Sequence, residues 1–266
     1  MPSRSFSLSA VVLGLVCAAC ALSGPSSREQ KLFDLVNKER EKAGLQKLVW
    51  DPQLGEAARV HTQLMAGKEE LSHQFSKEPT LERRAGSAGA KFDAVAENVA
   101  TAPSVQDVHR ALMESEHHRD NILDPNYNAV GMSIVEEGKQ LWVTQDFARV
   151  ITVRSDAQIG DEVVAAVGRL RQSHGLGHVE IRQDARLKRQ ACAQDPDAGK
   201  VKNDYTSASE LVIFTTTDPR KLPDTMKSAA LSKTVRRMDM GVCFEGGATS
   251  GFSKYWVVAA FYGGAN

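Results

Sequence analysis

Two segments near the start of the chain repeat apolar residues at the spacing of a helix. The first follows a predicted capping box, with Ser27 as N-cap and Gln30 three residues later. The second begins at Asp51-Pro52, an N-cap residue followed by proline at the first helical position. His61 lies on the apolar face of this second helix, so a packed, hydrogen-bonded core histidine is favoured over a ligand.

Further along, two pairs of short stretches have the residue pattern of strands. A third helix is predicted from Ser104 to about Glu116, and residues 68–95 are expected to be mainly loop with one short helix. A turn at 136–139 joins the first strand pair into a hairpin. The strands are expected at 129–135, 140–147, 241–245 and 255–262.

The same order of elements recurs in the second half of the chain. Residues 36–45 match 167–176, 51–58 match 184–191, and 142–147 match 256–261, in the same sequence order. Chance similarity between helices and strands of the same kind is the alternative. We favour two tandem copies of one unit, over residues 28–149 and 160–264.

Residues 1–22 have the pattern of a secretory signal. Arg4 supplies a positive charge, and residues 6–22 are apolar, uncharged and too short for a good membrane span. Two alanines precede Cys20, as in a bacterial lipobox, although Cys17 stands where that motif usually has leucine. We expect an exported protein, either an outer-membrane or surface lipoprotein lipidated at Cys20 or a secreted protein. Ordinary cleavage and a retained anchor helix are the alternatives, and a membrane is expected as partner only through the signal or the lipid.

Composition narrows the function classes. The 266 residues include 33 basic and 33 acidic side chains, and this balance gives no support to nucleic-acid binding. After removal of the signal, Cys192 and Cys243 are the remaining cysteines. In an exported protein they can form one disulfide, and two separate buried thiols are the alternative.

Polar residues that can carry chemistry gather in the first copy. They lie in Ser72-His73, in the ENVA stretch 97–100 and in the LMESEHHRDNIL stretch 112–123. The GMS stretch 131–133 and the TQDF stretch 144–147 follow. These five motifs, in this order, resemble those of the CAP superfamily, in particular its bacterial secreted branch. The resemblance covers about residues 31–148 and implies an α+β fold, a three-layer α-β-α sandwich with a cleft on one side of the sheet.

Carried over position by position, the resemblance implies a cleft lined by His73, Glu97 and His118. These three are the candidates for catalysis and for holding a metal. The eukaryotic branch has a second glutamate where Ser115 stands here, and either Glu114 or Glu116 beside it could substitute. Asn98 and His117 complete the implied cleft, and a shift of one residue would exchange the roles of His117 and His118.

Two imidazoles and a carboxylate suit several functions. They can bind Zn²⁺ or another divalent cation, form a polar cluster, or act as a general acid and base. No cofactor is expected to be required. Because the family's members are more often secreted binders than enzymes, we favour binding of an envelope or extracellular ligand (a lipid, glycan or peptide). The alternatives are a metal-assisted, peptidase-like hydrolase and a purely structural envelope protein.

The second copy lacks this polar set. Nothing in it matches His73, and we expect Glu210 opposite Glu97 and Ser228 opposite His118. We interpret it as a degenerate copy that kept the fold and lost the cleft. Cys192 is predicted on a helix and Cys243 on a strand, where a disulfide would stabilise a weaker core.

Overall fold

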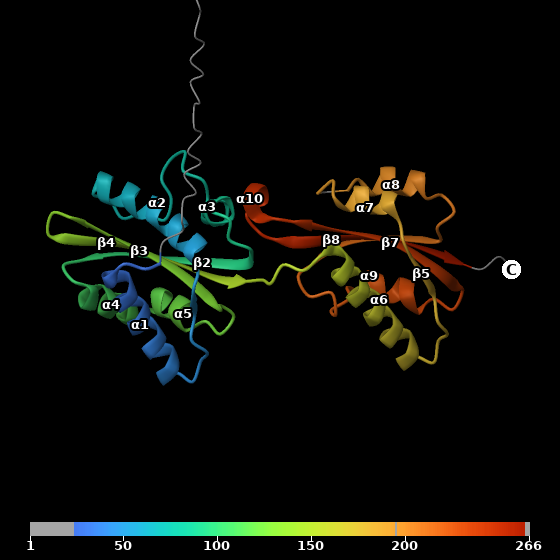
Figure 1. The fold of residues 1–266 in the computed structure, drawn as a ribbon, viewed down its shortest axis with the longest axis horizontal. Helices are drawn as coiled ribbons and strands as arrows, with labels where there is room; N and C mark the ends of the chain where they lie inside the picture. The colour runs from blue at the N-terminus through green and yellow to red at the C-terminus, as the bar shows by residue number, and fades with distance from the viewer. Residues whose placement is uncertain (1–23, 195, 264–266) are drawn as a thin grey trace, which may run out of the picture.

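Each half of the chain forms a sheet covered by helices on both faces (Figure 1). The computed structural model describes residues 24–194 and 196–263. The predicted signal and Cys20 lie outside the described residues. Within the described part, no helix is long and apolar enough to cross a membrane.

The first sheet has the strand order β1-β3-β4-β2, which makes β2 an edge strand. β1 is parallel to β3, whereas β2 and β3 are both antiparallel to β4. The strands are β1 (Val49–Trp50), β2 (Phe92–Ala102), β3 (Ala129–Glu137) and β4 (Gln140–Val150).

Helices cover both faces of this sheet and complete the expected three layers (Figure 1). One face carries α2 (Pro52–Lys68) and α3 (Leu81–Ser87). The other carries α1 (Ser27–Lys42), α4 (Val105–Glu114) and α5 (Glu116–Leu123). The predicted α+β fold, an α-β-α sandwich, is confirmed for this half.

The starts of the helices agree with the sequence in two cases and correct it in one. Asp51 caps α2 as predicted, accepting hydrogen bonds from the backbone of the first turn. The N-cap of α1 is Ser26 and not Ser27, because the Glu29 carboxylate accepts the Ser26 backbone N–H at 2.7 Å and closes the box one residue earlier. Ser104 caps α4 as predicted, and Ser115, whose backbone is extended (ψ 122°), ends that helix and separates it from α5.

The second sheet repeats the first strand for strand, in the order β5-β7-β8-β6. Its strands are β5 (Glu180–Gln183), β6 (Glu210–Thr216), β7 (Val235–Glu245) and β8 (Lys254–Gly263). Its helices are α6 (Asp156–Ser173), α7 (Ala185–Ala191), α8 (Ala198–Asp204), α9 (Asp224–Leu231) and α10 (Gly247–Ser250). Since parallel and antiparallel pairs also match, the chain holds two tandem copies of one topology.

In both copies, a helix packs closely against the sheet at a glycine of the sheet. A Cβ atom on Gly131 would lie 2.0 Å from the backbone nitrogen of Gly55 in α2. A Cβ atom on Gly241 would lie 2.0 Å from the backbone nitrogen of Lys188 in α7. These two glycines therefore mark equivalent positions in the copies, because only a residue without a side chain allows so close an approach.

A buried arginine also recurs. Arg40 of α1 donates a hydrogen bond to the Ile122 carbonyl at the end of α5, and Arg171 of α6 donates to the Ala230 carbonyl at the end of α9. Each of these bonds satisfies a carbonyl that the helix itself leaves without a partner. Ile122 and Ala230 are therefore equivalent, which places Met226 rather than Ser228 at the position of His118. Ala230 lies eleven residues before Gly241, whereas Ile122 lies nine residues before Gly131, because β7 extends further ahead of its glycine than β3 does. Counting back from the glycines does not include this difference and therefore gives Ser228.

The strand register of the two sheets corrects which residue of the second copy is equivalent to Glu97. In the first sheet Gly131 pairs with Asp146, which pairs with Glu97. The corresponding row of the second sheet is Gly241, Val258 and Ile213. Glu210 pairs with Phe261, three residues from the equivalent place. Apolar residues have thus replaced both acids of this row, which explains why the second copy lacks the polar centre of the first.

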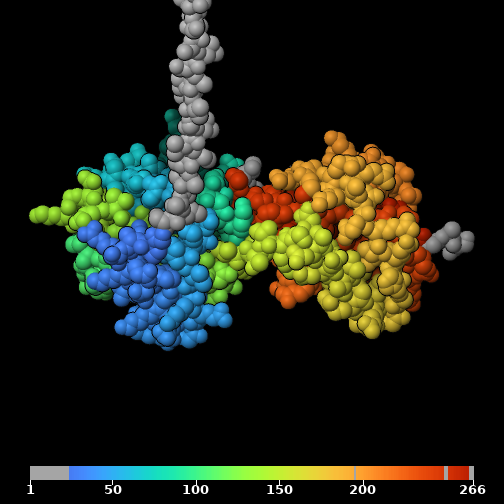
Figure 2. Space-filling model, viewed as in Figure 1, coloured from blue at the N-terminus to red at the C-terminus, as the bar shows by residue number. Residues whose placement is uncertain are grey.

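The two copies meet beside α3 and the start of β2. The Ser253 N–H donates to the Phe92 carbonyl at 2.7 Å, and the rings of Phe92 and Phe252 lie edge to face, 5.6 Å apart. α10 packs against α3 at this junction, which Figure 2 shows between the two rounded units. Within the second copy, a disulfide joins Cys192, after α7, to Cys243 on β7.

Candidate functional site

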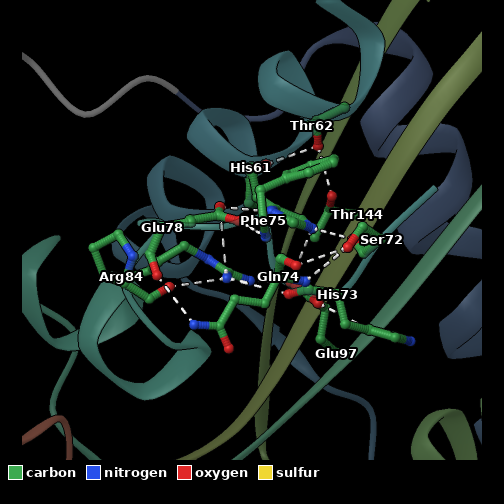
Figure 3. A network of polar contacts seen from close by, with 12 residues as sticks. His61, Thr62, Ser72, His73, Gln74, Phe75, Glu78, Arg84, Glu97 and Thr144 are labelled. Atoms are coloured by element: carbon green, nitrogen blue, oxygen red, sulfur yellow. Dashed lines mark hydrogen bonds and ion pairs between the residues drawn. The ribbon is translucent and has the colours of Figure 1, made fainter. Parts of the chain in front are cut away.

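Glu97 lies at the centre of a buried polar network in the first copy. Its side chain is 3 % exposed and leaves β2 on the face covered by α2 and α3. One carboxylate oxygen accepts a hydrogen bond from Nδ1 of His73 at 3.0 Å, and the other accepts one from Nη2 of Arg84 (Figure 3). Both oxygens of Glu97 are therefore held by nitrogen donors, one of which is the cationic guanidinium of Arg84.

His73 is the part of this network that solvent reaches. It lies in the loop after α2, and its side chain is 62 % exposed although its ring is anchored to buried Glu97. The hydrogen bond to Glu97 raises the pKa of His73, against the opposing effect of burial. The imidazole is thus fixed in orientation and favoured in its charged form.

Arg84 of α3 is the cation that balances the buried acids. Its side chain is 4 % exposed and lies between Glu97 and Glu78, with Nη1 3.6 Å from Oε1 of Glu78. Nη1 also donates to the Pro79 carbonyl. Arg84 and Glu78 were not among the predicted site residues, because residues 68–95 have no periodic pattern that would place them.

His61 holds the loop that carries His73. It is fully buried, with Nδ1 2.7 Å from Oε1 of Glu78 and Nε2 2.7 Å from the Ser72 carbonyl (Figure 3). His61 is therefore the packed, hydrogen-bonded histidine predicted from its place on α2. Its role is to fix the backbone immediately before His73.

Asp146 of β4 lies beside this polar network, although it was not among the predicted site residues. It lies opposite Glu97 in the strand register and is fully buried, and neither carboxyl oxygen has a hydrogen-bond partner among the residues the structure describes. Burial, with the nearby Glu97 carboxylate, raises the pKa of Asp146 well above its usual range. Its surroundings therefore favour the neutral form of Asp146.

This state predicts how stability depends on pH. The stability from the raised pKa of Asp146 is fully present below the unfolded pKa of about 3.9 and is lost as pH rises through the folded pKa. An Asp146→Asn variant cannot ionise there, so its unfolding free energy should gain on that of the unmodified protein by up to about 1.4 kcal/mol per pH unit in that window. Urea unfolding at a series of pH values measures the difference. Asp120→Asn, at an exposed position on α5, is the control, and a difference that does not change with pH would refute the assignment.

His118 reaches the site from the other layer of the sandwich. It lies on α5 and is half-buried, whereas His117 beside it is exposed. Burial lowers the pKa of His118, and the charges of His73 and His117 lower it further. His73 and His118 come from different faces of the sheet, and the charge of each is felt by the other beside the edge strand β2.

The other implied cleft residues have different surroundings. Asn98 is fully buried, donates to the His118 carbonyl at 3.0 Å and accepts from Asn121 at 2.9 Å, so it fastens α5 to β2. Ser115 is half-buried between α4 and α5, and Glu116 is exposed on the first turn of α5. The structure thus brings His73 and Glu97 into contact and His118 near them, and it gives Asn98 an internal role.

The side chains present do not suit a metal site that uses Glu97. No group of three His, Cys, Asp or Glu side chains close enough to hold a metal ion occurs among the described residues. Arg84 and His73 take the two oxygens of Glu97, and their charges would repel a cation at that carboxylate.

An apolar groove lies beside the network. It has a volume of about 610 Å³ and runs between α2, the loop before α3, and α3. Val60, Leu64 and Phe75 provide apolar walls, and Glu78 and Arg84 connect the groove to the network. A groove of this size and lining is typical of sites for small organic ligands.

Comparison with known proteins identifies this half of the chain. Residues 33–147 match the model of the CAP family, described as the cysteine-rich secretory protein family. The chain is 36 % identical over 126 residues to the uncharacterized protein YkwD of Bacillus subtilis strain 168, a match that covers 47 % of this chain and 49 % of YkwD. It spans about half or less of the length of the curated relatives it matches.

The chain is also similar to solved structures. An extracellular protein with an SCP domain from Bacillus anthracis is 27 % identical, with 48 % of this chain and 45 % of that chain covered and a TM-score of 0.43. The protein Na-ASP-1 is 12 % identical, with 94 % of this chain and 92 % of that chain covered and a TM-score of 0.48. With its five ordered motifs and its family match, the first half of this chain is a CAP domain of the cysteine-rich secretory protein family.

Proposed function

We propose that the first copy is an extracellular binding domain that holds an anionic group of its ligand at His73, along the open edge of β2. The observation that carries the proposal is the contrast in exposure within one network. Glu97 and Arg84 are 3 % and 4 % exposed, His61 is fully buried, and His73 is 62 % exposed. Burying several charged groups is costly, and this arrangement presents one fixed imidazole to solvent.

The charge of His73 indicates the kind of ligand. Because its pKa is raised, His73 favours the imidazolium, which attracts a carboxylate or phosphate and donates a hydrogen bond to it. The adjoining groove would take an apolar part of the same ligand. An envelope lipid, a cell-wall glycan with its peptide, and a free peptide all carry anionic groups. The predicted signal suits such a ligand, because it would export the protein to where these molecules occur.

The test compares retention of three probes by the unmodified protein and by His73→Gln. The probes are phosphatidylglycerol vesicles, insoluble peptidoglycan, and a peptide mixture from digested casein. We expect at least one probe to bind, and the substitution to weaken that binding about tenfold, since a hydrogen bond between charged groups is lost. Binding should also be stronger at pH 6 than at pH 8, because the imidazolium is lost as pH rises.

The matched control is Gln74→Ala, an exposed position next to His73. It should bind like the unmodified protein. Retention of none of the probes, or equal retention by the unmodified protein and His73→Gln, would contradict the proposal.

A second candidate function rests on the two histidines. The pKa of His73 is raised and that of His118 is lowered, which is the division expected of a general acid and a general base. A peptidase-like hydrolase would use His118 to deprotonate water and His73 to protonate the leaving group. Turnover of the casein peptides, lost in both His73→Gln and His118→Gln, distinguishes this function from binding alone.

A further inference from the structure

A second, polar cavity lies where the two copies meet, away from His73. It has a volume of about 660 Å³ and is bounded by the end of β4, the connection to α6, the end of β6 and the start of β8. Both copies contribute to its wall, so it exists only when they are joined as they are here. Its volume falls within the range of small-molecule sites.

The wall of this cavity carries more positive than negative charge. Two carboxylates line it, those of Asp93 and Asp218. Four cationic side chains line it, those of Arg149, Arg154, Lys221 and Lys254. Such a wall attracts an anion most strongly at low ionic strength.

Asp93 fixes the geometry at the centre of the junction. It accepts a hydrogen bond from Nε of Arg149 at 2.5 Å and one from Oγ1 of Thr217, in the second copy, at 2.7 Å. In the part of the chain that the structure describes, neither Nη group of Arg149 has a hydrogen-bond partner. The Nε bond therefore orients Arg149, and its two Nη groups remain available to a ligand.

Hydroxyl groups provide the second kind of contact. The end of β6 contributes a run of three threonines, Thr215 to Thr217, to the wall, and Thr215 is exposed. Lys254 faces the same space, with Nζ 5.0 Å from the ring centre of Trp256 and 3.4 Å from Glu245. Cations beside a row of hydroxyls suit a ligand that combines a carboxylate with many hydroxyl groups.

We propose that this junction binds an acidic saccharide, with Arg149 and Lys254 on its carboxylates and Thr215 on its hydroxyls. The site is independent of the proposed function at His73. Asp93 and Thr217 already connect the two copies at this place. A ligand that contacts both copies would strengthen that connection.

The test is calorimetric titration of the full mature chain at low salt with trigalacturonate, an acidic trisaccharide. We expect binding of trigalacturonate, at least tenfold weaker binding of the neutral trisaccharide maltotriose, and weaker binding of inorganic phosphate. Arg149→Gln and Lys254→Gln should each weaken trigalacturonate binding about tenfold, since each removes a charged partner. Lys254→Gln leaves the Asp93 bridge intact, so its effect cannot come from loss of that bridge.

Two controls separate this site from other parts of the surface. Lys227→Gln removes a half-exposed cation on α9, outside the cavity, and His73→Gln removes the first site. Neither should change the affinity for trigalacturonate. The proposal would be overturned by an absence of binding, by equal affinity for maltotriose or phosphate, by an equal effect of Lys227→Gln, or by loss in His73→Gln but not in Lys254→Gln.

Discussion

Replacing Arg84 with methionine should lower the free energy of unfolding by about 3–5 kcal/mol, the cost of leaving buried charges without their partner. Arg84 is the cation between Glu97 and Glu78, whose side chains are both 3 % exposed. Methionine fills similar space but offers neither charge nor donor. Both carboxylates would then lose the guanidinium between them, and only the contacts of Glu97 with His73 and of Glu78 with His61 would remain. Urea unfolding at neutral pH, followed by circular dichroism, measures the loss.

The neighbouring residue supplies the control for this experiment. Arg83 is exposed on the same helix, so Arg83→Met should change stability by less than about 0.5 kcal/mol. The double variant Arg84→Met with Glu97→Gln should recover part of the loss, because one of the uncompensated charges is gone. A loss below about 1 kcal/mol for Arg84→Met would show that the buried acids do not depend on this guanidinium.

Replacing Gly131 with alanine should also be severe, at about 3 kcal/mol or more, since overpacking in a core commonly costs about 1–3 kcal/mol and this clash involves backbone. The new Cβ atom would lie 2.0 Å from the Gly55 nitrogen and 2.3 Å from the Leu54 carbonyl carbon. A flexible side chain could rotate away, but these atoms belong to the helix itself. α2 would have to move off β3, and His61 and its contacts with the His73 loop would move with it.

Gly67, near the other end of α2, provides a matched control, because alanine there is expected not to lower the free energy of unfolding. A Cβ atom there would meet nothing within 4 Å. Alanine is the better helix former by about 1 kcal/mol, so Gly67→Ala should leave stability unchanged or raise it. Equal stability of Gly131→Ala and Gly67→Ala in urea would contradict the close packing of α2 on β3.

Local signals in the sequence were sufficient for most of the fold. Asp51-Pro52 specifies the start of α2 through a side-chain acceptor and a fixed φ angle, and both act over a few residues. The start of α1 was missed by one position because the stretch SSREQ contains two overlapping capping boxes. Which box forms depends on the direction in which the chain enters the helix, which the pattern does not contain.

The site was predictable only where a motif marked it. His73, Glu97 and His118 lie in motifs, but Arg84 and Glu78 lie in a segment without periodicity, and tertiary contacts alone bring them to Glu97. Asp146 belongs to the TQDF stretch. Its place opposite Glu97 depends on strand register, which the sequence of one strand does not specify.

Arg40 and Arg171, which are equivalent in the two copies, allow one copy to be compared with the other residue by residue. One copy has lost the residues equivalent to Glu97, Asp146 and His118, and yet it retains the arginine that binds the end of the second-layer helix. A residue present in both copies serves the shared architecture, whereas an exposed residue present only in the first copy, such as His73, is available for recognition. To change what this domain binds, the exposed residues around His73 and on the first turn of α5 can therefore be varied, whereas Arg40 should be kept.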